Sequence, residues 1–227
     1  MVYILHLETS TKVCSVALSL NGQVIQTVES NEGAYVHGEK LTLFIQEVCE
    51  KAQIEMKDLN AISVASGPGS YTGLRIGVST AKGLCYALGI PLIAIDSLTC
   101  IYEIVKANYS NSDILTVIDA RRMEVFSKLF SENGAVKEEI AATVIEETTF
   151  EQYDPLVVVG DGAEKLKEIW KNRKVDIVEG FCTSAIGQAS IAYRKFLAFE
   201  FEDVAYYEPF YLKDFIAGVS TKNILNQ

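Results

Sequence analysis

Hydrophobic and polar positions at the start of the chain alternate as in a β-sheet. The apolar run 2–8 predicts a buried strand that ends at Glu8. Residues 13–20 and 23–29 then alternate around Asn21-Gly22, a dipeptide typical of tight β-hairpins. The pattern predicts three strands, of which the last two form a hairpin.

The same order of apolar and turn residues returns in the second half of the chain. Residues 114–118 predict a strand that closes at Asp119, and the runs 124–130 and 135–145 flank Asn133-Gly134. An acidic residue therefore ends the first strand of each set, and a hairpin follows it. This repetition indicates two copies of one structural unit.

Each hairpin is followed by segments with helical and strand spacing. In the first half the pattern predicts a helix over 37–53, a strand over 61–65, a helix over 74–88 and a strand over 91–95. The second half gives a short helix near Phe150, strands over 156–159 and 175–178, and helices over 164–171 and 184–199. Both halves are thus interpreted as β-β-β-α-β-α-β-α.

This repeated order resembles the architecture of the actin, sugar-kinase and Hsp70 ATPase superfamily, in which two similar α/β lobes of ribonuclease H type (the ASKHA fold) enclose a cleft. We expect an N-terminal lobe over residues 1–107, a C-terminal lobe over 108–216 and a polar tail over 217–227. Glu8 and Asp119 would then face each other across the cleft. A shared architecture does not by itself give a function.

The most distinctive stretch is the glycine-rich segment Ser66-Gly67-Pro68-Gly69-Ser70-Tyr71-Thr72-Gly73-Leu74-Arg75-Ile76-Gly77, between a predicted strand and a predicted helix. Such a turn can bind an anion, because the first amides of a helix lack internal partners. It has neither a Gly-Lys-Ser/Thr ending nor G-x-G-x-x-G spacing. We therefore favour a tight turn with Ser70 or Thr72 as helix cap, and keep the anion site as the weaker alternative.

The helix after this turn is apolar on most sides and contains Gly73, Gly77 and Gly83. Glycine inside a helix costs about 1 kcal/mol relative to alanine, so three of them suggest that another backbone approaches closely. Burial in the lobe and burial against a partner are both consistent with this pattern. As partner-contacting positions we name residues on this helix and the one before it: Leu41, Phe44, Ile45, Gly73, Leu74, Gly77 and Val78.

Composition narrows the class of protein. The 227 residues carry a net charge of −10, so binding of nucleic acid by this chain alone is disfavoured. The five cysteines are scattered without a CxxC pair, and the first residues lack the charge pattern of a signal peptide. Together with the absence of an 18-residue apolar run, these features predict a cytoplasmic protein with reduced thiols and no membrane association.

The acidic strand ends are the candidate chemistry of the cleft. Glu8-Thr9-Ser10 and Asp119, together with Gly160 and Gly162 in the turn Gly160-Asp161-Gly162-Ala163, form a possible vestigial cofactor site that would bind ATP or ADP weakly. Arg121 and Arg122 follow Asp119 and could bind an anion. In so acidic a chain, pairing with carboxylates is the favoured use of these arginines.

Histidine chemistry is restricted to His6 and His37. His6 lies inside the first predicted strand, and Leu41 stands four residues after His37, so a helical His-x-x-x-His metal pair is impossible. Neither histidine lies beside a nucleophile motif. The sequence therefore predicts no catalytic residue and no metal site.

Several of these segments together resemble the TsaB family, also called YeaZ. The resemblance rests on Glu8-Thr9-Ser10, the stretch 66–77, Asp119-Ala120-Arg121-Arg122-Met123-Glu124-Val125, Gly160-Asp161-Gly162-Ala163 and Pro209-Phe210-Tyr211-Leu212-Lys213. These segments follow one another in order over nearly the whole chain. The resemblance implies a role in forming N6-threonylcarbamoyladenosine at position 37 of tRNAs that read codons starting with A.

The resemblance also implies partners. TsaB is the non-catalytic paralogue of TsaD, the subunit that transfers the group, and the two form a heterodimer through a helical bundle that the ATPase TsaE joins. In the catalytic relative a His-x-x-x-His on the first helix holds the metal, and Leu41 stands at the second of those places here. The chain would accordingly stabilise and activate a TsaD-like subunit, meet tRNA only through that complex, and form a homodimer when alone.

Two alternatives to a scaffold stay open. A nucleotide-binding ATPase or kinase-like enzyme of the actin fold is suggested by the paired acids Glu8 and Asp119. A glycoprotease-like (M22) metalloprotease is suggested only by a former label of the family, and the spacing of the two histidines speaks against it.

Overall fold

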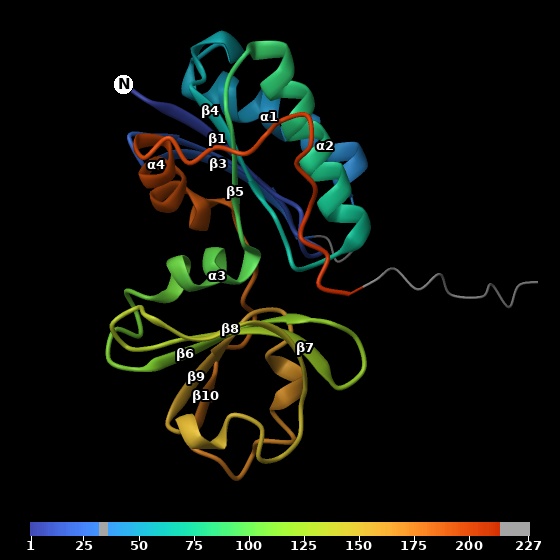
Figure 1. Cartoon of the computed structure of the whole chain (residues 1–227), viewed down its shortest axis with the longest axis vertical. Coiled ribbons are helices and arrows are strands. Elements are labelled where there is room, and N and C mark those ends of the chain that lie inside the picture. The colour runs from blue at the N-terminus through green and yellow to red at the C-terminus, as the bar shows by residue number, and fades with distance from the viewer. Residues whose placement is uncertain (32–35, 214–227) are drawn as a thin grey trace, which may run out of the picture.

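The computed structural model describes residues 1–31 and 36–213, and it contains two five-stranded sheets arranged one beyond the other along the long axis (Figure 1). The first sheet has the order β3-β2-β1-β4-β5. It consists of β1 (Tyr3–Glu8), β2 (Cys14–Leu20), β3 (Gln23–Ser30), β4 (Ala61–Ala65) and β5 (Leu92–Ile95). We call this sheet and the helices packed on it the first lobe.

The second sheet repeats the plan of the first, with the order β10-β9-β6-β7-β8. It consists of β6 (Asp113–Asp119), β7 (Glu124–Phe130), β8 (Val136–Val144), β9 (Leu156–Val159) and β10 (Val175–Ile177). In both sheets a central strand pairs antiparallel with the next strand and parallel with a later one. This duplication confirms the predicted two-lobed α/β fold of actin and Hsp70 type.

Both predicted hairpins are present. Asn21 and Gly22, between β2 and β3, have φ angles of 50° and 82°, which are the positive values that a tight hairpin turn requires. Gly134 has a φ of 83° in the turn between β7 and β8. The Asn-Gly dipeptides therefore fix the first three strands of each lobe.

Helices cover both faces of the first sheet. The long helices α1 (His37–Ala52) and α2 (Tyr71–Leu88) lie together on one face, and α4 (Ala189–Leu197) lies on the other (Figure 1). The N-cap of α2 is Ser70, whose side chain accepts from the Gly73 amide, and its C-cap is the left-handed Gly89. The predicted cap at Ser70 is thus confirmed, and the helix begins three residues earlier than expected.

The second sheet is covered unequally. Helix α3 (Ser97–Val105), capped by Asp96, packs on the face that looks toward the first lobe (Figure 1). The repeated order predicted a helix after the strand 91–95, but the spacing of apolar residues gave it no bounds. The other face carries short 3₁₀ turns, and the fully buried Trp170 fills its core. The 3₁₀ turns of the chain are η1 (Met56–Asp58), η2 (Glu151–Tyr153), η3 (Glu164–Leu166) and η4 (Ala185–Gln188).

The predicted helix over 164–171 is wrong, and the predicted helix over 184–199 is shortened to η4 and α4. Fifteen residues, 160–174, join β9 to β10, and so short a segment gains little from helical hydrogen bonds alone. Trp170 is instead held by packing and by its Nε1–H, which donates to the carbonyl of Glu146 at 2.9 Å. Tertiary contacts therefore outweigh the helical spacing of this segment.

The chain returns to the first lobe after the second sheet. Residues 198–213, which we call the strap, follow α4 and run along α2 (Figure 1). Glu202 bridges Leu92 of β5, the Phe210 amide donates to the Ser66 carbonyl at 2.8 Å, and Lys82 on α2 donates to the Tyr207 carbonyl at 2.8 Å. The boundaries at residues 107 and 216 stay predictions, and the expected tail 217–227 lies outside the described residues.

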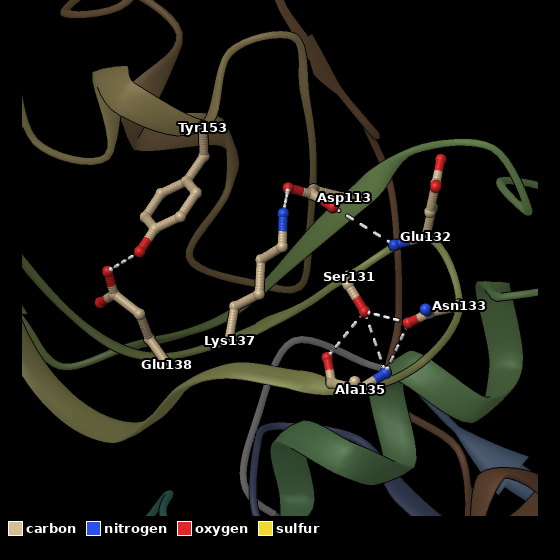
Figure 2. A network of polar contacts seen from close by, with 8 residues as sticks. All are labelled: Asp113, Ser131, Glu132, Asn133, Ala135, Lys137, Glu138 and Tyr153. Carbon is tan, nitrogen blue, oxygen red and sulfur yellow. Dashed lines mark hydrogen bonds and ion pairs between the residues drawn. The ribbon is translucent and has the colours of Figure 1, made fainter.

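A polar network stabilises the hairpin end of the second lobe (Figure 2). Ser131 Oγ bonds Asn133 and the backbone of Ala135, and Lys137 forms an ion pair with Asp113 at 2.5 Å. Beside them, Tyr153 Oη donates to a carboxylate oxygen of Glu138 at 2.7 Å. These contacts join β6, β7, β8 and η2 at the hairpin whose turn lies against Tyr102 of α3.

Candidate functional site

The turn after β1 forms the first-lobe side of the inter-lobe site. Glu8 ends β1 and is fully buried, and its Oε1 accepts from the Ser10 amide at 2.7 Å. Burial raises the pKa of Glu8, and the nearby charge of Asp161 raises it further. Within the described residues, Glu8 Oε2 and the Ser10 hydroxyl have no hydrogen-bond partner. Glu8, Thr9 and Ser10 thus form one buried turn, and their role as a cofactor site stays a prediction.

The second-lobe side is built from the ends of β6 and β9. Asp119 ends β6, and its Oδ1 accepts from the Arg121 amide and from Lys165 Nζ. Asp161, in the turn after β9, accepts from the Asp119 amide at 3.0 Å, and burial raises its pKa. Asp161, rather than Asp119, is the carboxylate whose charge acts on Glu8. The sequence singled out its two glycine neighbours and missed Asp161 itself.

Gly160 and Gly162, predicted as cofactor-binding positions, hold the turn against β6. A Cβ on Gly160 would lie 1.8 Å from the Val117 carbonyl oxygen, and Gly160 has a φ of 131°. A Cβ on Gly162 would lie 3.1 Å from the Asp119 amide. Close packing of the two strand ends therefore explains these glycines.

The glycine loop over residues 66–77 packs on the turn after β1. The Ser70 amide donates to the Ser10 carbonyl at 2.6 Å, and Thr9 Oγ1 donates to the Gly73 carbonyl at 2.8 Å. A Cβ on Gly73 would lie 2.1 Å from the Thr9 carbonyl oxygen, and one on Gly77 would lie 2.3 Å from Thr9 Oγ1. The segment that these glycines allow to approach closely is thus Thr9 and Ser10 of the same chain.

Burial corrects the residues named for partner contact. Phe44 is partly exposed, but the other six are buried inside the first lobe: Leu41, Ile45, Gly73, Leu74, Gly77 and Val78. Their apolar spacing marks the face of each helix that packs on the sheet. Buried side chains offer little surface to a partner, and of these six only Ile45 also lines the groove described next. The assignment of partner contacts therefore stays a prediction.

The accessible side of the same helix pair carries an apolar groove of about 370 Å³. It runs between α1 and α2 and is closed at one end by the loop before β4. Its lining includes Thr42, Ile45, Gln46, Cys49, Ile54, Met56, Thr80 and Leu84. The groove is therefore the part of this helix pair that a second molecule could contact.

Both histidines have structural partners. His6 is buried in β1 between the hydroxyls of Ser63 and Ser19, at 2.6 and 2.8 Å, and burial lowers its pKa to about 3. His37 Nε2 bonds the Thr11 carbonyl at 2.9 Å. Over residues 1–31 and 36–213, no three histidine, cysteine or acidic side chains are grouped as metal ligands. The same ranges contain no helix that is long and apolar enough to cross a membrane.

The expected pairing of Arg121 and Arg122 with carboxylates is wrong. Both side chains are exposed, and the part of the chain that the structure describes gives neither an ion pair. The neighbouring acids are occupied by lysines instead: Asp119 by Lys165 and Glu124 by Lys213. No local pattern in the sequence indicates these two lysines, because each lies far along the chain from its acid.

Comparison with known proteins points to one family. The family model described as TsaD, tRNA N6-adenosine threonylcarbamoyltransferase, matches residues 30–218. The tRNA threonylcarbamoyladenosine biosynthesis protein TsaB of Escherichia coli is 29% identical over 94% of this chain and 96% of its own length. The protein of the same name from Bacillus subtilis is 32% identical over 76% of this chain and 68% of its own.

A solved structure has the same fold. YeaZ from Pseudomonas aeruginosa superposes with a TM-score of 0.80 at 22% identity, over 93% of this chain and all of that chain. The two-lobed arrangement therefore belongs to a known architecture.

Proposed function

This chain belongs to the TsaB family, also called YeaZ, of tRNA threonylcarbamoyladenosine biosynthesis proteins, and from that premise we propose that it is a non-catalytic scaffold subunit. In this proposal it binds, stabilises and activates a TsaD-like catalytic subunit. That subunit forms N6-threonylcarbamoyladenosine at position 37 of tRNAs that read codons starting with A. A role on tRNA would place the chain in the cytoplasm.

One observation carries the proposal: the polar groups that could do chemistry in the cleft are largely bonded to the chain itself. The Ser70 amide at the start of α2 is bonded to Ser10, and Asp119 is bonded to Lys165. An anion at this helix start would have to displace the Ser10 carbonyl, and a cation at Asp119 would compete with an ammonium group already in place. These contacts favour a structural use of the cleft.

The groove between α1 and α2 is the partner surface of the proposal. Thr42, Gln46 and Thr80 edge it, and apolar side chains form its floor. An apolar groove between two helices suits a helix of a partner, whose own apolar face would fill it. When the catalytic partner is lacking, a second copy of this chain would use the same groove, and a TsaE-like ATPase would join after the heterodimer forms.

The test is binding and tRNA modification with a charge placed in the groove. Thr42 is exposed, so Thr42→Arg leaves the core intact, whereas an arginine at the buried Val78 would confuse lost binding with lost folding. We expect Thr42→Arg to weaken binding of the TsaD-like subunit roughly 100-fold, because the complex would bury a charge that has no opposite charge beside it. Thr148→Arg, at an exposed position of the second lobe, is the matched control.

Titration calorimetry gives the affinities, and the yield of modified tRNA with and without this chain gives the activation. Light scattering over a range of concentrations shows whether the chain alone dimerises through the groove. A folded Thr42→Arg variant that binds and activates as the wild type does would refute the assignment of the groove.

The unbonded groups Glu8 Oε2 and Ser10 Oγ favour one alternative, a nucleotide-binding enzyme of the actin fold. Buried polar atoms without partners are uncommon, and a bound ligand would satisfy them. Calorimetry with Mg-ATP decides the point. Tight binding that Asp119→Ala abolishes would support the enzyme, and absence of heat would leave at most weak binding of ATP or ADP.

A further inference from the structure

Arg121 and Arg122 differ from the other arginines of the described chain. Arg75 stacks on Tyr71, Arg173 pairs with Asp154, and Arg194 donates to Ser190. The side chains of Arg121 and Arg122 have no ion pair, ring contact or hydrogen bond within residues 1–31 and 36–213. Two adjacent cations are therefore left unpaired in a chain whose net charge is −10.

The backbone holds both residues in an unfavourable conformation. Arg121 and Arg122 have φ angles of 69° and 50°, in the left-handed region that residues with a Cβ seldom adopt. The Arg121 amide donates to Asp119 at 2.9 Å, and Lys165 Nζ donates to the Arg122 carbonyl at 3.1 Å. Such conformations persist only where neighbours impose them, and they concentrate at functional sites.

The acids around this loop do not cancel its charge. Asp119 and Glu124 already pair with Lys165 and Lys213. Lys12, exposed in the turn after β1, lies near enough to Asp161 for their charges to interact. We call Lys12, Arg121 and Arg122 the basic rim, because they lie where the two lobes meet.

We propose that the basic rim contacts phosphodiester groups of the tRNA, an inference that rests on the function proposed above. Exposed arginines on a loop suit the backbone of a long polyanion, which needs charge rather than an enclosing pocket. A free nucleotide needs enclosure, and the nearest helix start is already covered by the Ser10 carbonyl. The chain would thus touch tRNA directly and would not act only through its partner.

The test uses the complex with the TsaD-like subunit and unmodified tRNA. Arg121→Asn with Arg122→Asn removes both charges, and asparagine tolerates a positive φ, so the fold is retained. We expect tRNA to bind roughly tenfold more weakly, and the slope of log affinity against log salt to fall by about 1.5, for two lost phosphate contacts. Arg121→Lys with Arg122→Lys should keep most of the slope.

Arg194→Gln with Lys171→Gln removes two exposed charges elsewhere and should change neither quantity. Unchanged tRNA affinity and slope in the asparagine variant, with wild-type assembly and modification intact, would overturn this inference alone. Loss of Mg-ATP binding or of partner binding, with tRNA affinity unchanged, would also overturn it. A wild-type complex that neither assembles nor modifies tRNA would overturn the proposed function, and this inference with it.

Discussion

The two sheets share one strand order but are covered and held differently. Helices of 16 and 18 residues cover one face of the first sheet, whereas the outer face of the second carries single turns around Trp170. Ion pairs also differ. Those of the described first lobe lie on its surface at Lys51 and Lys57, while the second lobe has the largely buried pair of Arg173 with Asp154. A duplicated strand plan therefore leaves the covering layers free to specialise.

The difference between the two lobes fits the functions proposed above. The long helices of the first lobe form an apolar groove, and the strand ends of the second lobe carry exposed cations. One lobe is thus suited to a protein partner and the other to a polyanion. Four predictions test how far the interactions that stabilise the two lobes differ.

The largest effect is expected at Trp170, because the second lobe has no long helix on that face to support its core. Trp170→Ala should lower the free energy of unfolding by about 3–5 kcal/mol, through lost burial and an empty cavity. Urea titration measures the change, and amide exchange should locate it in the second lobe. Equal loss of protection in both lobes would show that they unfold as one unit.

Acid should act mainly on the first lobe, which contains both histidines of the chain. The pKa of His6 is lowered from 6.5 to about 3, so the unfolded chain binds this proton more readily than the folded one. Above pH 6.5 this histidine does not lower the free energy of unfolding. As the pH falls from 6.5 toward 3, it lowers that free energy by up to about 1.4 kcal/mol per pH unit.

The measurement is the difference in unfolding free energy between wild type and His6→Asn at pH 6.5 and 4.5. The comparison with a variant is needed because Glu8 has a raised pKa, so its protonation stabilises the fold as the pH falls and opposes the effect of His6. An equal pH slope in the two proteins would contradict the assignment to His6.

Two glycines of α2 should respond oppositely to alanine. Gly73→Ala would place a Cβ 2.1 Å from the Thr9 carbonyl oxygen and should cost roughly 1–3 kcal/mol. Gly83→Ala meets nothing within 4 Å and should stabilise the helix by about 1 kcal/mol. Thermal unfolding of the two variants measures both shifts. Similar shifts would mean that the loop can move away from Thr9.

The smallest effect is expected at the hairpin end of the second lobe. Lys137 pairs with Asp113, but its side chain is 39% exposed, so Lys137→Ala should cost about 0.2–1 kcal/mol. High salt should reduce that difference further. A loss above 2 kcal/mol in urea titration would show that the network in Figure 2 acts as a unit.

Sequence patterns predicted the strands well because period-two alternation and Asn-Gly turns are local signals. They gave no bounds for α3, whose residues are apolar on most sides, and they were wrong for residues 164–171, where helical spacing was present but the segment is short. Repetition of the first half also led to helices in the second half that the chain does not form.

The candidate site was only partly predictable, for a different reason. Glu8 and Asp119 could be found because each ends the first strand of its own sheet, just before the turn that leads into a hairpin. Lys165 reaches Asp119, and Lys213 reaches Glu124, from distant segments, and no local pattern reveals either contact. Apolar spacing reports that a face is buried, but it cannot tell a lobe's own core from a partner's surface, which is why the buried residues Leu41 and Val78 were named as partner contacts.

The strap has a consequence for how the protein is made. Residues 1–95 supply every strand of the first sheet, yet α4 and the strap that cover it come from residues 189–213. On the ribosome, one face of the first sheet and the glycine loop therefore stay uncovered until the second sheet has been synthesised. The lobe that is translated first is thus the last to be completed, and chains that stop before residue 189 would expose apolar surface to aggregation.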